Sequence, residues 1–137
     1  MHTCYEECEM VKKIMVVDDN PDVIFSIKNG LEGIGSNSYE IIGAESGKKC
    51  IEILLSDQIP DIILLDIMMP DMSGWETFDK LKENDAWREI PVVFLTARTD
   101  RVAKNAGGFL GDDYIEKPFD IQDIQRRIEK LFEVRKK

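Results

Sequence analysis

The 137-residue sequence has no long apolar segment and no excess of positive charge. Even the apolar run Ile62–Leu65 is bounded by Asp61 and Asp66, far short of the about 18 residues that a membrane-spanning helix needs. The N-terminal segment MHTCYEECEMVKK is acidic and lacks the apolar stretch of a signal peptide. We therefore expect a protein without a membrane segment, located in the cytoplasm.

Cysteine and histidine are also scarce. Cys4, Cys8 and Cys50 are odd in number and lack paired spacing, which excludes a disulfide framework and favours free thiols in a reducing compartment. The one histidine, His2, forms with Cys4 and Cys8 a spacing that matches no familiar zinc site. We interpret residues 1–11 as a flexible N-terminal tail.

Positive charge is too sparse for a nucleic-acid-binding surface. Lysine and arginine number 18 against 27 acidic residues, and the formal net charge is −9. Such a surface repels phosphate backbones, and basic residues interleaved with aromatic ones are absent from the sequence. Near the C-terminus, Glu129 and Glu133 interrupt the basic residues at helical spacing, which is typical of a solvated helix face. We predict no nucleic-acid partner.

The composition, 43% hydrophobic and 33% charged, is that of one globular domain, which we place at 12–134 with a C-terminal tail at 135–137. Apolar runs and turn residues predict strands alternating with helices. The predicted strands are 12–18, Tyr39–Ala44, 61–67, 92–96 and Tyr114–Glu116. The predicted helices follow Pro21, Ser46, Gly74 and Asp120, with a weak one at Arg101–Leu110. Five such units imply an α/β fold, a parallel sheet with helices on both faces.

Polar side chains follow four of the predicted strands. Asp18 and Asp19 end the first strand, Asp66 the third, Thr96 the fourth and Lys117 the fifth. Functional groups of an open α/β sheet collect at the carboxyl ends of its strands, so we expect these residues to meet. Each one alone has an ordinary explanation as a strand end, a turn or a surface lysine. The combination is harder to explain in that way.

Their chemistry favours phosphoryl transfer. Three neighbouring carboxylates are costly unless a cation joins them, and oxygen ligands of this kind suit Mg²⁺. Lys117 supplies a positive charge for an anionic oxygen, and Thr96 a hydroxyl donor. A metal, an ammonium and a hydroxyl around one carboxylate stabilise a phosphoryl group in transfer, with Asp66 as the acceptor.

The segments VVDDNP, LLDIMMPDMSG, VVFLTAR and DDYIEKPF occur in the order seen in response regulators of two-component systems. From about Lys12 to Phe132 the sequence resembles their receiver domain. The resemblance implies a flavodoxin-like (βα)5 fold, a three-layer sandwich with strand order 2-1-3-4-5. It also implies that Asp66 takes phosphate from the phosphohistidine of a sensor histidine kinase.

The resemblance further assigns roles to individual residues. Asp19, Asp66 and the backbone carbonyl of Met68 would ligate Mg²⁺, and Asp18 would act partly through water. Lys117 would pair with Asp66 or with its phosphate. The Lys117-Pro118 peptide bond matches one that is cis in the family.

Two further roles concern the response to phosphorylation. Thr96 would hydrogen-bond a phosphoryl oxygen, and Tyr114 would swing inward as Thr96 moves. Met68 and Arg98 would flank the attacking water without positioning it, which predicts slow self-hydrolysis.

The segment AKNAGGFLGDDY departs from the family with its glycines, and the loop GIGSNS is slightly long. We further expect Met68, Met69 and Met72 to pack in the loop after the third strand, Trp75 to be a helix packing residue, and Trp87, in the loop before the fourth strand, to be half-exposed.

Three alternatives remain at this point. An aspartyl phosphatase requires a second acid where Met68 stands, and a flavin or nucleotide module requires a glycine-rich loop in place of DDNP. A binding module that needs no phosphorylation would lack one of the five site positions. We favour a stand-alone receiver, a switch and not an enzyme. Its partners would be a kinase and a target or histidine phosphotransfer protein, with a weak or phosphorylation-dependent homodimer left open.

Overall fold

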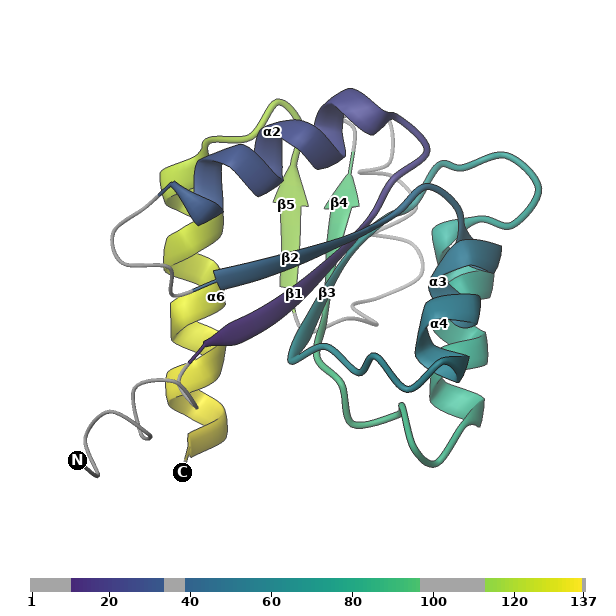
Figure 1. Cartoon of the computed structure of the whole chain (residues 1–137). Helices are drawn as coiled ribbons and strands as arrows, with labels where there is room; N and C mark the ends of the chain where they lie inside the picture. Colours follow the sequence, from purple (N-terminus) through teal and green to yellow (C-terminus); the bar gives the residue numbers. More distant parts are fainter. Residues whose placement is uncertain (1–10, 34–38, 97–112, 137) are drawn as a thin grey trace.

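The computed structural model describes residues 11–33, 39–96 and 113–136, and these carry the structural statements below. Its centre is a five-stranded sheet in the order β2-β1-β3-β4-β5, and every neighbouring pair is parallel (Figure 1). The strands are β1 (Lys12–Val17), β2 (Tyr39–Ala44), β3 (Ile62–Asp66), β4 (Val92–Thr96) and β5 (Asp113–Glu116). The predicted strand order is confirmed.

Four described helices cover the two faces of the sheet, giving three layers (Figure 1). Residues of α2 and α6 pack on one face, and residues of α3 and α4 on the other. The helices are α2 (Pro21–Glu32), α3 (Gly47–Leu55), α4 (Gly74–Glu83) and α6 (Ile121–Lys136). The fold is the predicted α/β sandwich of the flavodoxin-like class.

The central strands β3 and β4 are almost entirely apolar because both faces of the sheet are covered. All five residues of β3 and of β4 are buried. Alternate residues belong to different layers: Ile63 and Leu65 contribute to the core under α3 and α4, whereas Ile62 and Leu64 contribute to the core under α2 and α6. This burial fixes the register and so aligns the strand ends.

The helices begin at the capping residues that the sequence indicated. The side chain of Asn20 accepts a hydrogen bond from the backbone of Asp22, with Pro21 in the first turn. Ser46 caps α3, and Asp120 accepts from the backbone of Gln122 at the start of α6. These caps set where the chain leaves each strand end and turns back over the sheet.

Several boundaries and placements differ from the predictions. β1 ends at Val17 and β3 at Asp66, each one residue early, while α6 continues to Lys136. Trp87 is buried, 7% exposed, because it packs into the core under α3 and α4, so its predicted half-exposure is wrong. Trp75 packs against the same core, as predicted.

Some predictions concern residues outside the described part of the chain. They are the tail at 1–10 with its Cys4 and Cys8, the end of the loop GIGSNS, Arg98 and the helix at 101–110.

Within the described ranges, none of the helices has both the length and the apolar character needed to cross a membrane.

Candidate functional site

The polar residues predicted to meet do lie at one edge of the sheet. Asp18 and Asp19 follow β1, Asp66 is the last residue of β3, Thr96 the last of β4, and Lys117 follows β5. These four strands are consecutive neighbours and run in the same direction, so their carboxyl ends share one edge. Residues about a hundred positions apart in the sequence therefore form one site.

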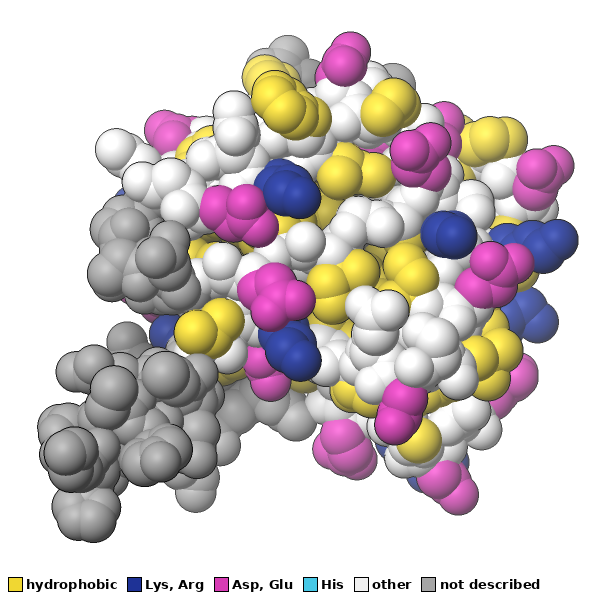
Figure 2. All heavy atoms as spheres, viewed as in Figure 1, with side chains coloured by type: hydrophobic (Ala, Val, Ile, Leu, Met, Phe, Trp, Pro, Cys, Tyr) yellow, Lys and Arg dark blue, Asp and Glu magenta, His cyan; other side chains and the backbone are white. Residues whose placement is uncertain are grey.

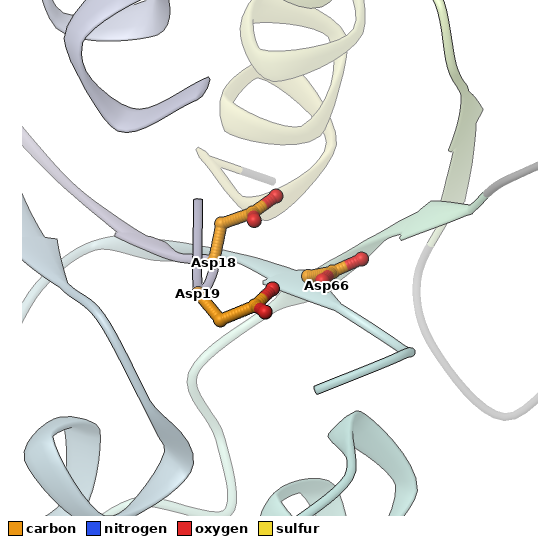
Figure 3. A group of neighbouring side chains, drawn as sticks. All are labelled: Asp18, Asp19 and Asp66. Atoms are coloured by element: carbon orange, nitrogen blue, oxygen red, sulfur yellow. The ribbon is translucent and has the colours of Figure 1, made fainter. Parts of the chain in front are cut away.

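Three carboxylates form the centre of this site (Figure 3). Asp18, Asp19 and Asp66 each offer one oxygen, and these oxygens lie within 4.8 Å of one another. Asp18 is 1% and Asp66 4% exposed, whereas Asp19 is open to solvent. The cluster therefore has a buried side and an accessible side.

Lys117 joins the two buried carboxylates. Its Nζ donates to Asp18 Oδ2 at 2.9 Å and to Asp66 Oδ1 at 3.2 Å. The predicted pairing of Lys117 with Asp66 is present, but the contact with Asp18 is the shorter of the two. The Lys117-Pro118 peptide bond is cis, as expected.

The ionisation of these groups is perturbed. Burial, and then the negative charge of Asp18, raise the pKa of the Asp66 carboxyl to about 6, although Lys117 opposes the change. Burial alone would lower the pKa of Lys117, but the hydrogen bond and charge of Asp18, together with Asp66, outweigh it and raise that pKa. Lys117 is therefore a charged partner, and Asp66 is a carboxylate that a further cation would stabilise.

Backbone contacts fix the two ends of the acidic cluster. The backbone N–H of Asn20 donates to Asp18 Oδ1 at 2.9 Å. Gly74, the first residue of α4, donates its N–H to the carbonyl of Ile67 at 2.8 Å. A Cβ at Gly74 would lie 2.3 Å from the backbone oxygen of Asp66, so only glycine allows this approach. We did not identify Gly74 as a site residue from the sequence, where the only signal was a glycine after the capping Ser73.

The two predicted switch residues, Thr96 and Tyr114, are buried. Thr96 is 5% and Tyr114 8% exposed. In the sheet register, Tyr114 pairs with Phe94, two residues before Thr96. The carbonyl of Thr96 accepts from the backbone of Lys117 at 2.6 Å, which connects the ends of β4 and β5. Thr96, Tyr114 and Lys117 are thus neighbours across two strands.

Met68 lies in the loop that follows β3. Its side chain is 66% exposed, so the expectation that it packs in the loop is wrong. Met69 is the methionine of this loop that is buried, at 9% exposure. Because the Met68 side chain is apolar, this position provides no polar group that could orient a water molecule approaching Asp66.

The donor set fits a hard divalent cation. The site offers oxygen ligands and one accessible side, and burial together with the charge of Asp18 raises the pKa of Asp66, so that a bound cation would stabilise its ionised form. Bound there, Mg²⁺ would neutralise charge that develops on phosphoryl oxygens. Asp18, Asp19 and Asp66 are the residues that would hold it.

A parallel α/β domain with an acidic cluster and a lysine at its strand ends defines a class of signalling domain. The model of the response regulator receiver domain matches residues 14–129, and the chain belongs to that family. It is 40% identical over 116 residues, 84% of its length, to a probable cyclic di-GMP phosphodiesterase of Vibrio cholerae. It is 36% identical over 90% of its length to the transcriptional regulatory protein CrdR of Helicobacter pylori.

A solved structure is similar as well. The receiver domain of the sensor histidine kinase PA1611 of Pseudomonas aeruginosa is 26% identical, with a TM-score of 0.73 over 87% of this chain and 95% of that one. That structure has a magnesium ion coordinated in its active-site cleft. The chain spans only 25% and 56% of the two curated relatives, so their names describe longer proteins. Its stand-alone character stays a prediction.

Proposed function

We propose that this receiver domain is a phosphorylation-operated switch in which Asp66 accepts a phosphoryl group from a histidine kinase, with Mg²⁺ as the cofactor. The observation that carries the proposal is the convergence of Asp18, Asp19, Asp66 and Lys117 within one site at the strand ends. Membership of the receiver family supports it.

The transfer step uses groups already in place. An oxygen of the Asp66 carboxylate attacks the phosphorus atom, a new O–P bond forms, and the N–P bond of the donor phosphohistidine breaks, leaving the electron pair on the imidazole nitrogen. Lys117 lies 3.2 Å from Asp66 Oδ1 and balances negative charge near the incoming group. Asp18 keeps Lys117 in position through its 2.9 Å contact.

The response is a shift between two conformations. Thr96 donates its hydroxyl to a phosphoryl oxygen, and Tyr114 moves into the space beside it. Their burial and the cross-strand register support this coupling. The domain then signals through a changed protein-binding surface or passes the phosphoryl group to a partner histidine.

The proposed partners are proteins. They are a sensor histidine kinase and either a target or a histidine phosphotransfer protein, whereas the net charge of −9 disfavours nucleic acid as a partner of this domain. A cytoplasmic location is part of the same proposal.

Intact-mass measurement after incubation with acetyl phosphate tests the acceptor. Wild-type protein should gain one phosphoryl group with Mg²⁺ and none with EDTA. Asp66→Asn should gain none, whereas Asp79→Asn, which changes an exposed carboxylate on α4, should behave as wild type.

Two results would contradict the proposal. Phosphorylation that persists in Asp66→Asn would assign the acceptor to another residue. No addition to the wild-type protein at millimolar Mg²⁺ would favour a binding module that works without phosphorylation.

A further inference from the structure

A chain of aromatic rings leads from Tyr114 to the first turn of α4. The ring centroids of Tyr114 and Phe94 are 5.6 Å apart, with an interplanar angle of 25°. The centroid of Phe94 lies 4.8 Å from that of Trp75 and 5.3 Å from that of Phe78, both residues of α4. All three distances are typical of rings in direct contact. Phe94 therefore contacts both Tyr114 of β5 and helix α4.

Phe94 is placed to register any movement of Tyr114. It is fully buried, pairs directly with Tyr114 in the sheet, and precedes Thr96 by two residues on the same face of β4. A closely packed core offers little free volume, so a displaced Tyr114 ring changes the packing around Phe94. The adjoining ring of Trp75 must respond to the same change.

The first turn of α4 is also tied to the acceptor strand. Ser73 and Glu76 form reciprocal hydrogen bonds that make this turn rigid, at 2.9 and 3.2 Å. Gly74, next to Trp75, donates to Ile67 and lies against the backbone of Asp66. Trp75 therefore lies between two routes from Asp66: a direct one through the backbone, and an aromatic one through Tyr114 and Phe94.

We propose that Phe94 and Trp75 couple Tyr114 to helix α4, so that phosphorylation of Asp66 repacks the first turn of α4 through this aromatic chain. The coupling rests on the function proposed above. It makes Phe94 and Trp75 positioning residues for the switch and extends the phosphorylation-sensitive region to the face of the sheet covered by α3 and α4. Because coupling is reciprocal, a change at Trp75 must alter the conformational equilibrium of Tyr114 and with it the phosphorylation of Asp66.

Tryptophan fluorescence tests the coupling directly. The chain has two tryptophans, and Trp87→Phe leaves Trp75 as the single emitter. In this background, acetyl phosphate with Mg²⁺ should shift the emission maximum or intensity of Trp75 in step with the gain of one phosphoryl group by intact mass. Tyr114 contacts Phe94, and Phe94 in turn contacts Trp75. Adding Tyr114→Leu to this background should therefore abolish the emission change while phosphorylation continues.

The outcomes distinguish the backbone route through Gly74 from the aromatic route through Phe94. They also distinguish failure of the coupling from failure of the proposed phosphorylation. An emission change that survives Tyr114→Leu would show that the signal reaches Trp75 directly through Gly74 and would overturn the aromatic coupling. Phosphorylation without any emission change would overturn it as well. Failure of the phosphoryl group to add would contradict the proposed function itself, and the coupling would fall with it.

The reciprocal measurement uses the affinity of the Asp66 site for beryllium fluoride, a stable mimic of the phosphoryl group, in the presence of Mg²⁺. Trp75→Leu should change the dissociation constant by about fivefold, the lower end of the range found for coupled sites. Trp75→Phe keeps an aromatic ring against Phe94 and should keep the wild-type dissociation constant. Equal dissociation constants in all three proteins, or the same altered value in both variants, would contradict a role for the ring contact.

Discussion

At the residue scale, Lys117 is shared unequally between the two buried carboxylates of the site. Its Nζ lies 2.9 Å from Asp18 and 3.2 Å from Asp66, and the backbone N–H of Asn20 fixes Asp18. Because the strand ends of a parallel sheet share an edge, the sequence predicts that these side chains meet. The unequal sharing depends on rotamers and on the Asn20 contact, which have no signal in the order of residues.

The raised pKa of Asp66 makes its charge a cost to the folded state. A carboxyl whose pKa is about 6 in the folded protein, against about 3.9 when unfolded, destabilises the fold when it is ionised. In EDTA at pH 7.5, Asp66→Asn should therefore raise the free energy of unfolding by about 3 kcal/mol, since the two ionisation constants differ by roughly a hundredfold and each tenfold corresponds to ~1.4 kcal/mol. Urea unfolding at a series of pH values measures this difference.

The stability gained by Asp66→Asn should decrease as the pH falls. The advantage of Asp66→Asn should be nearly complete above about pH 6, decline as the pH falls from that value to about pH 4, and vanish near pH 3, where the wild-type carboxyl is protonated in both states. Asp79→Asn, at an exposed position, should show no such pH-dependent gain. A gain for Asp66→Asn that is constant from pH 4 to pH 7.5 would exclude this explanation.

We expect the exposed side chain of Met68 to affect a different property, the lifetime of the phosphoryl group on Asp66. Met68 offers no hydrogen bond to water near Asp66, so Met68→Asn should give severalfold faster loss of the phosphoryl group by supplying a polar group there. The decay of phosphorylated protein after removal of the donor gives the rate. Met68→Leu keeps the side chain apolar and should match wild type, and an unchanged rate in Met68→Asn would reject this role.

At the scale of elements, α4 and β3 pack so closely that one residue type fits between them. A methyl group at Gly74 would collide with the backbone of Asp66 and Ile67, which cannot move aside as a flexible side chain can. Gly74→Ala should cost about 1–3 kcal/mol of stability, as overpacking does. It should also slow phosphoryl uptake, because the acceptor strand end shifts.

Gly30→Ala is the matched control for this change. The three atoms nearest to its added methyl would all belong to the side chain of Ile121, where α2 and α6 pack, and not to the backbone of Asp66. It should lower stability by a similar mechanism and leave the phosphorylation rate of the folded protein unchanged. Equal effects of both variants on that rate would show that Gly74 contributes only to stability.

The elements themselves were predictable where local and tertiary preferences agree. Asn20 with Pro21, and Ser46, cap helices as expected, and the apolar run 62–65 is a strand buried on both faces. Trp87 was placed in an exposed loop because it lies between a helix and a strand. It is buried because that connection folds back over the core, a tertiary contact that short-range patterns do not contain.

At the scale of the whole molecule, the site exists only when the sheet is complete. Its carboxylates come from β1 and β3 and its lysine from the segment after β5, and strand order 2-1-3-4-5 brings them together. The alternation of strands and helices predicts this arrangement because right-handed crossovers leave few topologies. The unfolded chain separates Asp18 from Asp66, so it has no equivalent cation site.

Mg²⁺ should therefore stabilise the folded state by mass action. At a free concentration ten times the dissociation constant, the free energy of unfolding should rise by about 1.4 kcal/mol, provided that the unfolded chain does not bind. Thermal unfolding at constant ionic strength measures the gain. Asp19→Asn removes an exposed ligand, so it should leave the core unchanged and abolish most of the stabilisation by Mg²⁺. Asp79→Asn, outside the cluster, should keep this stabilisation. Equal gains in all three proteins would show that Mg²⁺ acts on the general excess of 27 acidic over 18 basic residues and not on the cluster at the strand ends.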